Sequence, residues 1–401
     1  MRLSKGNIAT MFVFILIICA CSRADVNSDL LKAADEGDLK AIIRCLKKGA
    51  DANAKDNEGS SALIIAVKKG NVDIVSQLIE SGADINAKDN EGATALLWAL
   101  QEGHADVASQ LIAKGADVNA KDGKNVTPLL WAADIAQADI IAQLLAKGAD
   151  VNAKDNEGFT ALMRAIKGAV VNAMDNEDDT SLMRSEGKGN EEVVSLFLAK
   201  GADVNAKDNE GATALMMASE GDNADVIAQL IAKGADVNAK DNEGYTALMR
   251  AAGKGFADCV KILLGKGANV NAKDNEGFTA LIVASEEDNA EVVAQLLASG
   301  ADVNAQTANG ATALIKASAQ GNADCIKLLL AKGANVNSKA SDGGTALIMA
   351  SGQGDVNIVK LLIAKGAKTN MMMSDGSDAL KAAESNGHNE VVEILKAAGA
   401  R

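Results

Sequence analysis

The residues best suited to hold a cation stand in an acidic phrase that recurs along the chain, as in Asp84-Ile-Asn86-Ala-Lys88-Asp89. Oxygen-bearing side chains at alternate positions are typical of calcium-binding loops. Here, however, Lys88 stands at a ligand position, Asp89 stands where the loop needs glycine, and Ala95 stands where it needs glutamate. The phrase therefore does not predict a calcium site.

Imidazole and thiol groups offer little more. The only histidines, His104 and His388, lie far apart in the sequence, whereas zinc sites and Cys–His nucleophile pairs need such groups side by side. The carboxylates recur at regular intervals, and no glycine pattern of the phosphate-binding kind follows a predicted strand. We therefore expect no catalytic residue, no metal site, no cofactor and no enzymatic activity.

The spacing of the acidic phrase points to a scaffold. Lys-Gly-Ala-Asp-Val-Asn-Ala-Lys-Asp-Asn-Glu-Gly occurs in full three times, at residues 147–158, 200–211 and 233–244. A catalytic site needs its groups only once. The glycine of each Gly-Ala phrase recurs with a period of about 33 residues, which is typical of a solenoid of stacked repeats. One interval is shorter, that between Gly148 and Gly168.

Residues 206–238 show how one repeat is built. Thr213 is suited to cap a short first helix, because its hydroxyl can accept a hydrogen bond from a free amide of the first turn. A second helix carries Val, Ile and Leu on one face and polar residues on the other. Gly234 ends it, since glycine adopts the left-handed conformation without a steric clash. Neither helix can bury its apolar face alone, so neighbouring repeats must cover it.

These features resemble ankyrin repeats. The marks are the period of the glycines, Asp-x-x-Gly-x-Thr before the first helix, and Gly-Ala-Asp-Val-Asn after the second. The resemblance implies an all-α ankyrin-repeat solenoid of about 12 units, including caps and one truncated repeat. The chain departs from the family where Thr-Pro-Leu-His becomes Thr-Ala-Leu and an apolar residue; only Thr127-Pro128-Leu129-Leu130 keeps the proline.

The resemblance also divides the chain into capping repeats, full repeats and one short unit. The expected parts are an N-terminal capping repeat at residues 29–52, repeats at 53–152, the truncated repeat at 153–172, repeats at 173–370, and a C-terminal capping repeat at 371–401, where Asp378 replaces the threonine.

In the truncated repeat, Lys167-Gly168 follows Ile166 directly, so a second helix is expected to be missing. The next finger, the β-turn loop that joins two repeats, has Asp178 where glycine normally supplies a positive φ. The unit is either an imperfect duplication that bends the array or a functional hinge.

The N-terminus does not fit the repeat. Arg2 and Lys5 precede an apolar run from Ile8 to Ala20, which is too short to span a bilayer comfortably and is typical of a secretory signal. The run ends Ile18-Cys19-Ala20-Cys21, which resembles a bacterial lipobox, although Cys19 stands where a small or β-branched residue is preferred.

This second resemblance implies a signal peptide at residues 1–20, a lipidated Cys21 and a linker over residues 21–28. Ordinary secretion and an uncleaved anchor are the alternatives, and the two cysteines are then only small apolar residues. The expected location is the cell envelope, as a periplasmic or surface lipoprotein, or the exterior of the cell as a secreted protein.

The chain is acidic. Removing residues 1–20 takes away two of the 40 basic residues and none of the 54 acidic ones, which leaves a net charge of 38 − 54 = −16. An acidic chain is a poor ligand for phosphate backbones, so we expect no nucleic-acid partner. We expect a monomer that reaches a membrane only through the lipid anchor.

Three cysteines follow the N-terminal segment. Cys259 and Cys325 stand at equivalent positions of two repeats, with one repeat between these two. Helices stacked at about 10 Å would hold them about 20 Å apart, beyond the roughly 7 Å that a disulfide spans. We expect these residues and Cys45 to be buried thiols.

With catalysis, metal binding and nucleic-acid binding not expected, protein recognition is the function that remains. In ankyrin proteins, partners usually bind the concave surface formed by fingers and first helices, so the resemblance implies a protein partner. Here the fingers are nearly constant, and diversity lies at the residue after the finger glycine and at the fourth residue after the threonine. The candidate partner-binding residues at these positions are Trp98, Trp131, Phe159, Arg164, Tyr245, Arg250, Phe278 and Lys316. Trp, Tyr and Arg dominate interface energetics.

Trp98 and Trp131 are expected about 10 Å apart in successive repeats, as one patch. Arg164 and Arg250 add positive charge that would suit an acidic partner segment. The alternative is that these side chains only pack over the first helices. Replacing Trp98, Trp131 and Arg250 together by alanine is expected to abolish partner capture at little cost in stability.

Two functional classes remain. Interface-type residues at variable positions favour an exported module that binds a partner protein through its concave face. The near-identical fingers favour a structural or spacer protein of the envelope without a specific partner, although recent duplication explains them equally well. A secreted effector that acts on host proteins is a further form of the binding function.

Overall fold

The computed structural model describes residues 25–174 and 191–401. The expected signal peptide, the lipidation site Cys21 and Asp178 lie outside these ranges. The described part is helical, with isolated β-bridges and no strand, which confirms the predicted all-α fold. Its first helix spans residues 25–36 and therefore begins inside the expected linker.

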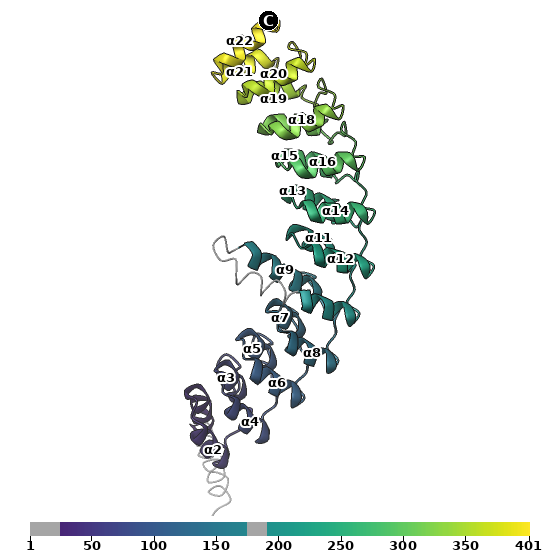
Figure 1. The fold of residues 1–401 in the computed structure, drawn as a ribbon. Helices are drawn as coiled ribbons and strands as arrows, with labels where there is room; N and C mark the ends of the chain where they lie inside the picture. Colours follow the sequence, from purple (N-terminus) through teal and green to yellow (C-terminus); the bar gives the residue numbers. More distant parts are fainter. Residues whose placement is uncertain (1–24, 175–190) are drawn as a thin grey trace, which may run out of the picture. The chain divides into compact units, whose positions relative to one another are not determined.

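Each repeat contributes a first helix, which follows a finger, and a second helix, which follows a short turn (Figure 1). The first helices are α3 (Ala62–Lys68), α5 (Ala95–Gln101), α7 (Pro128–Asp134), α9 (Ala161–Met174), α11 (Ala214–Glu220), α13 (Ala247–Lys254), α15 (Ala280–Glu286), α17 (Ala313–Gln320), α19 (Ala346–Gln353) and α21 (Ala379–Ser385). The second helices are α2 (Leu39–Lys47), α4 (Val72–Glu80), α6 (Ala105–Ala113), α8 (Ala138–Ala146), residues 191–199, α12 (Ala224–Ala232), α14 (Ala257–Gly265), α16 (Ala290–Ala298), α18 (Ala323–Ala331), α20 (Val356–Ala364) and α22 (Asn389–Ala397).

The chain divides into two compact units. The N-terminal unit comprises residues 1–168 and 188–202, and the C-terminal unit comprises residues 169–187 and 203–401. Within each unit, first helices pack on first helices and second helices on second helices, as with α11 on α13 and α12 on α14. Leu215, Ile227 and Leu230 are buried between them, so neighbouring repeats supply the cover that a single helix pair lacks.

The predicted helix ends are confirmed in the example repeat. Thr213 Oγ1 accepts the backbone N–H of Met216 at 3.4 Å at the start of α11. Gly234 follows α12 with a φ of +92°, the left-handed conformation that closes a helix. In the C-terminal capping repeat, Asp378 takes the place of threonine and accepts the N–H of Lys381 at 2.9 Å.

Hydrogen bonds between successive repeats explain why the phrase recurs. Asn205 Oδ1 accepts the backbone N–H of Asp236 at 2.8 Å, and its Nδ2 donates to the carbonyl of Gly234 at 3.0 Å. Lys207 Nζ donates to the carbonyl of Lys240 at 2.6 Å. Asparagine and lysine of the phrase therefore bind one repeat to the next, rather than a ligand.

The rest of the finger is equally occupied, except for its glutamate. Asp208 Oδ1 accepts the N–H groups of Glu210 and Ala212. Gly211 has a φ of +80°, and a Cβ on it would lie 2.9 Å from the backbone nitrogen of Asn242. Among the described residues, the finger glutamates have exposed side chains that make no hydrogen bond or ion pair: Glu58, Glu91, Glu157, Glu210, Glu243 and Glu276.

In the expected truncated repeat, the first helix is longer than in the other repeats. α9 passes through Gly168, whose φ is not positive. A glycine inside a helix costs about 1 kcal/mol relative to alanine but does not by itself end the helix. The next described helix spans residues 191–199, where Phe197 is fully buried. The residues between α9 and this helix lie outside the described ranges, so the truncated repeat at residues 153–172 stays a prediction.

The three cysteines of the described residues are free and buried, as expected. Cys259 Sγ donates to Asp222 Oδ1 at 3.6 Å, and Cys325 Sγ donates to Asp288 Oδ1 at 3.7 Å. Burial, reinforced by the charge of the neighbouring aspartate, raises the pKa of both thiols to about 12. Since the thiolate is the nucleophile, neither thiol is reactive near neutral pH.

Wild type is expected to lose folding stability as the pH rises into the alkaline range. Replacing Cys259 and Cys325 by alanine is expected to make this loss smaller. The unfolded chain releases these protons near the ordinary thiol pKa of about 8.5, whereas the folded chain holds them up to about pH 12. Between these values the unfolded chain binds fewer protons, so the free energy of unfolding falls as pH rises. Urea unfolding of wild type and variant at about pH 7.5 and about pH 10.5 measures the two falls. An equal fall in both proteins would contradict the prediction.

Candidate protein-binding face

The candidate residues form one set of four in each unit. Trp98, Trp131, Phe159 and Arg164 lie in the N-terminal unit, and Tyr245, Arg250, Phe278 and Lys316 lie in the C-terminal unit. All of them are half-buried. Some stand on first helices and the others at the base of the fingers. We call the surface that each set forms the helix-one face of its unit.

Trp98 and Trp131 occupy equivalent positions on α5 and α7, which pack on each other. Trp98 Nε1 donates to Asp89 Oδ2 at 2.7 Å, and Lys68 Nζ lies 3.7 Å from its ring centroid. Trp131 has neither contact within the described residues, and Gln101 stands at the position equivalent to Lys68. Trp131 therefore keeps a ring face and an indole N–H for a partner.

Arg250 is held by two carboxylates, Glu220 on the preceding first helix and Asp241 in its own finger, the latter at 2.6 Å. The Asp241 side chain is only 4% exposed and also accepts the N–H of Tyr245 at 2.8 Å. Burial lowers the pKa of Arg250, but the hydrogen bonds and charges of Asp241 and Glu220 outweigh it, so this pKa lies above its usual range. The positive charge is thus compensated within the chain.

Arg164 repeats this arrangement in the N-terminal unit. It pairs with Asp134 on α7 and with Asp155 in its own finger, and its Nε donates to Asp155 Oδ2 at 3.1 Å. Each of the two arginines therefore faces two carboxylates. These ion pairs argue against Arg164 and Arg250 as free positive charges for an acidic partner segment, and their role in partner binding stays a prediction.

Lysine side chains cover the phenylalanine rings. Lys316 Nζ pairs with Glu286 Oε1 at 2.9 Å and lies 5.0 Å from the centroid of Phe278. Lys167 Nζ lies 4.6 Å from the centroid of Phe159. Both aromatic residues are therefore partly engaged within the chain.

One spacing links the contacts on the first helices. The fourth residue after the threonine touches the residue 30 positions earlier, at the end of the preceding first helix. The pairs are Lys68 with Trp98, Asp134 with Arg164, Glu220 with Arg250, and Glu286 with Lys316. Where the position is Val283, its partner is Gly253, on which a Cβ would lie 2.9 Å from Val283 Cγ1. Part of the sequence diversity on this face is therefore packing, as the alternative interpretation proposed.

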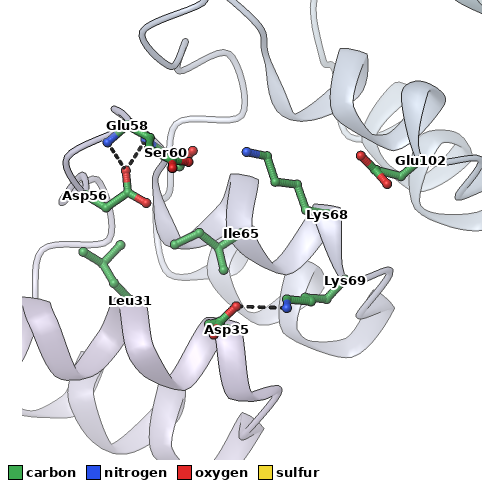
Figure 2. A pocket seen from close by; sticks show the side chains of 9 residues that line it. All are labelled: Leu31, Asp35, Asp56, Glu58, Ser60, Ile65, Lys68, Lys69 and Glu102. Atoms are coloured by element: carbon green, nitrogen blue, oxygen red, sulfur yellow. Dashed lines mark hydrogen bonds and ion pairs between the residues drawn. The ribbon is translucent and has the colours of Figure 1, made fainter.

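A hollow lies between finger and first helices at the same place in both units, with a volume of about 490 Å³ in the N-terminal unit and about 370 Å³ in the C-terminal unit. Figure 2 shows the first, with Lys69 paired to Asp35 at 3.0 Å below Ile65, and Asp56 and Glu58 beside it in the finger. Equivalent residues line both hollows: Asp35 and Glu220, Glu58 and Glu243, Ser60 and Tyr245, Ile65 and Arg250, Lys69 and Lys254, Glu102 and Glu287. The charges at the rim are the same, while the floor differs.

The helix pairs, capped fingers and inter-repeat hydrogen bonds recur along the chain, and family models match it accordingly. A model described as ankyrin repeats in three copies matches residues 30–122 and, in overlapping segments, residues 167–401; a single ankyrin repeat matches residues 124–156. The chain belongs to the ankyrin-repeat family. No curated protein matches it in a sequence search. Ankyrin repeats support, in general, a protein–protein interaction module.

The two histidines of this ankyrin-repeat protein have structural contacts. His104 Nε2 lies 3.2 Å from the carbonyl of Lys68, and His388 Nε2 lies 3.0 Å from that of Gly352, so both imidazoles join successive repeats. Over residues 25–174 and 191–401, no group of three or more His, Cys, Asp or Glu residues is placed to hold a metal ion. In the same ranges, no helix has the length and apolarity needed to cross a bilayer.

Proposed function

We propose that this ankyrin-repeat protein is exported and binds a partner protein through the helix-one face, which would be its concave face. The observation that supports this proposal is the environment of Trp131. Its side chain is half-buried, its indole N–H has no acceptor among the described residues, and it stands beside Trp98. Tryptophan in such a setting is the type of side chain that anchors interfaces. The protein acts as a monomeric binding module without catalysis.

A structural role as an envelope spacer is the second candidate. The hydrogen bonds from Asn205 and Lys207 to the next repeat favour it, because they turn the constant phrase into a regular acidic scaffold. In this role the half-buried tryptophans only pack against neighbouring residues.

Capture from cell extract separates the two candidates. We expect the purified protein to retain a partner from envelope extract, or from host-cell extract if it is a secreted effector. Trp131→Ala is expected to retain about tenfold less, since an anchoring tryptophan contributes at least about 1.4 kcal/mol to binding. The matched control is Val72→Ala, which removes an apolar side chain that is 40% exposed on α4 and is expected to bind like wild type.

Far-UV circular dichroism and thermal unfolding of each variant show that it is folded. Equal retention by wild type and Trp131→Ala would place the contact away from the helix-one face. If no extract yields a protein that is retained, the spacer role stands instead.

The N-terminal sequence supports export and lipidation. Arg2, Lys5 and the apolar run to Ala20 precede Cys21, as in a lipoprotein signal, and we assign the anchor to Cys21. Mass spectrometry of the mature protein tests this assignment. A chain that begins at Cys21 with a diacylglyceryl group is expected; an unmodified N-terminus would indicate ordinary secretion, and an intact Met1 would indicate an uncleaved anchor.

A further inference from the structure

The chemistry of the partner can be inferred from the charges around the two hollows. In the C-terminal unit, Glu220, Glu243 and Glu287 stand at the rim, against Lys254 and Arg250. Arg250 is already bound by Glu220 and by Asp241, so it offers no charge to a ligand. With Arg250 and Glu220 paired, Glu243 and Glu287 remain against Lys254, so the hollow is net negative.

The same balance holds in the N-terminal unit. The carboxylates of its hollow are Asp35, Asp56, Glu58 and Glu102, and its cations are Lys68 and Lys69. Lys69 pairs with Asp35 at 3.0 Å, and Lys68 lies over the ring of Trp98. Both hollows therefore have an acidic rim, while the residues at their floors differ. A basic partner segment would match the rims, and the side chains beside its basic residues could vary to match the floors.

The finger glutamates give this negative charge a fixed spacing. Glu210, Glu243 and Glu276 belong to three successive fingers of identical sequence, Lys-Asp-Asn-Glu-Gly. The same bond fixes each finger to the next: the N–H of Asn242 donates to the carbonyl of Glu210 at 2.9 Å, and the N–H of Asn275 donates to that of Glu243 at 2.9 Å. Since stacked helices lie about 8–10 Å apart, the carboxylates recur at about that interval.

A segment in the extended polyproline II conformation has three residues per turn and advances about 3.1 Å per residue, so one turn covers one repeat and every third side chain faces the same side. An α-helix advances only about 1.5 Å per residue and would need about six or seven residues for the same step. The finger glutamates therefore match an extended segment with one cation in every three residues.

We propose that the helix-one face of the C-terminal unit binds an extended segment of the partner protein with lysine or arginine at every third position. The cations pair with Glu210, Glu243 and Glu276, and the residues between them lie over Tyr245 and Val283. The fingers are already held by their own hydrogen bonds, so little order is lost on binding. This inference rests on the proposed binding function and specifies its ligand.

Fluorescence anisotropy with synthetic peptides of about 12 residues, enough to pass three fingers, tests the inference on the full chain. The first peptide carries lysine at every third position. The second has the same composition with its lysines gathered at one end, and the third has glutamate in place of lysine. The first is expected to bind about tenfold tighter than the second, and more weakly as salt rises; the third is expected not to bind.

Two protein variants locate the contact. Glu210→Gln, Glu243→Gln and Glu276→Gln together are expected to weaken the affinity for the first peptide about tenfold, since each exposed ion pair contributes only modestly. The matched control removes the same charge from second helices, through Asp225→Asn, Asp258→Asn and Glu291→Gln, whose side chains are also exposed. It is expected to bind like wild type.

Equal affinity for the first and second peptides, equal losses in the two variants, or no binding of the first peptide would each overturn the inference. If the captured partner requires Trp131 but is indifferent to the finger glutamates, the binding function stands and only the basic segment is refuted. If no partner is captured at all, the proposed function itself fails.

Discussion

Replacing Gly244 by alanine is expected to lower the free energy of unfolding by about 3 kcal/mol. Gly244 has a φ of +86°, and a Cβ on it would lie 2.9 Å from both the backbone nitrogen of Asn275 and the Cα of Asp274. These are backbone atoms of the next finger, so they can yield only if the repeats move apart. The N–H of Asn275 also donates to Glu243 in the same contact. Chemical denaturation followed by circular dichroism measures the loss.

The matched control is Gly234→Ala. Gly234 has a φ of +92°, but nothing lies within 4 Å of its added Cβ. It therefore carries the left-handed strain alone, which costs about 1 kcal/mol. The difference between the two variants isolates the contact between fingers. If both lose the same stability, the close approach of successive fingers does not stabilise the array.

Arg250→Ala is expected to cost about 2 kcal/mol of stability, because it leaves the Asp241 carboxylate, only 4% exposed, without its cation. Breaking a fully buried ion pair costs about 3–5 kcal/mol. The estimate is lower here because the Arg250 side chain is 21% exposed and Glu220 is 38% exposed, so water screens part of the effect. The sequence alone led to the opposite expectation, that replacing Arg250 together with Trp98 and Trp131 costs little stability, and the measurement decides between the two.

Urea unfolding of Arg250→Ala and of the double variant Arg250→Ala with Asp241→Asn measures this effect. Neutralising Asp241 is expected to restore part of the stability, since no charge is then left buried. Lys316→Ala serves as the comparison, because its partner Glu286 is 26% exposed and the loss should stay below about 1 kcal/mol. A double variant less stable than Arg250→Ala would contradict the ion-pair explanation.

The fold was predictable because its signals are local and repeated. Thr213 as a cap and Gly234 as a stop each rest on a few neighbouring residues, and the regular period of the repeat multiplies the evidence. Gly168 lies inside α9, although the same Gly-Ala pair ends the second helices elsewhere in the chain. Whether such a glycine is left-handed or helical depends on what packs around it, which sequence alone does not specify.

The candidate residues could be found from the sequence because their positions vary between repeats. The residues that contact them could not be found in the same way. The partners of Arg250 are an aspartate of its own finger and a glutamate of the preceding first helix. Only the register of successive first helices brings Glu220 to Arg250. The sequence does contain opposite charges 30 residues apart, as in Glu220 and Arg250, and this pattern indicates packing between successive repeats. Trp131 lacks the cation over its ring because Gln101 stands where Lys68 stands one repeat earlier. Its indole N–H makes no bond to Asp122, the equivalent of Asp89.

The central claim is that a partner protein covers the helix-one face, and ¹⁹F NMR of the 5-fluorotryptophan-labelled protein tests it most directly. The chain has two tryptophans, Trp98 and Trp131, and both lie on this face. The partner carries no fluorine, so every ¹⁹F resonance comes from one of these two residues. Adding the captured partner is expected to shift the Trp131 resonance and to reduce its solvent isotope effect, because the open indole becomes covered. If the complex forms and both resonances stay at their free positions, the partner binds elsewhere and the claim is wrong.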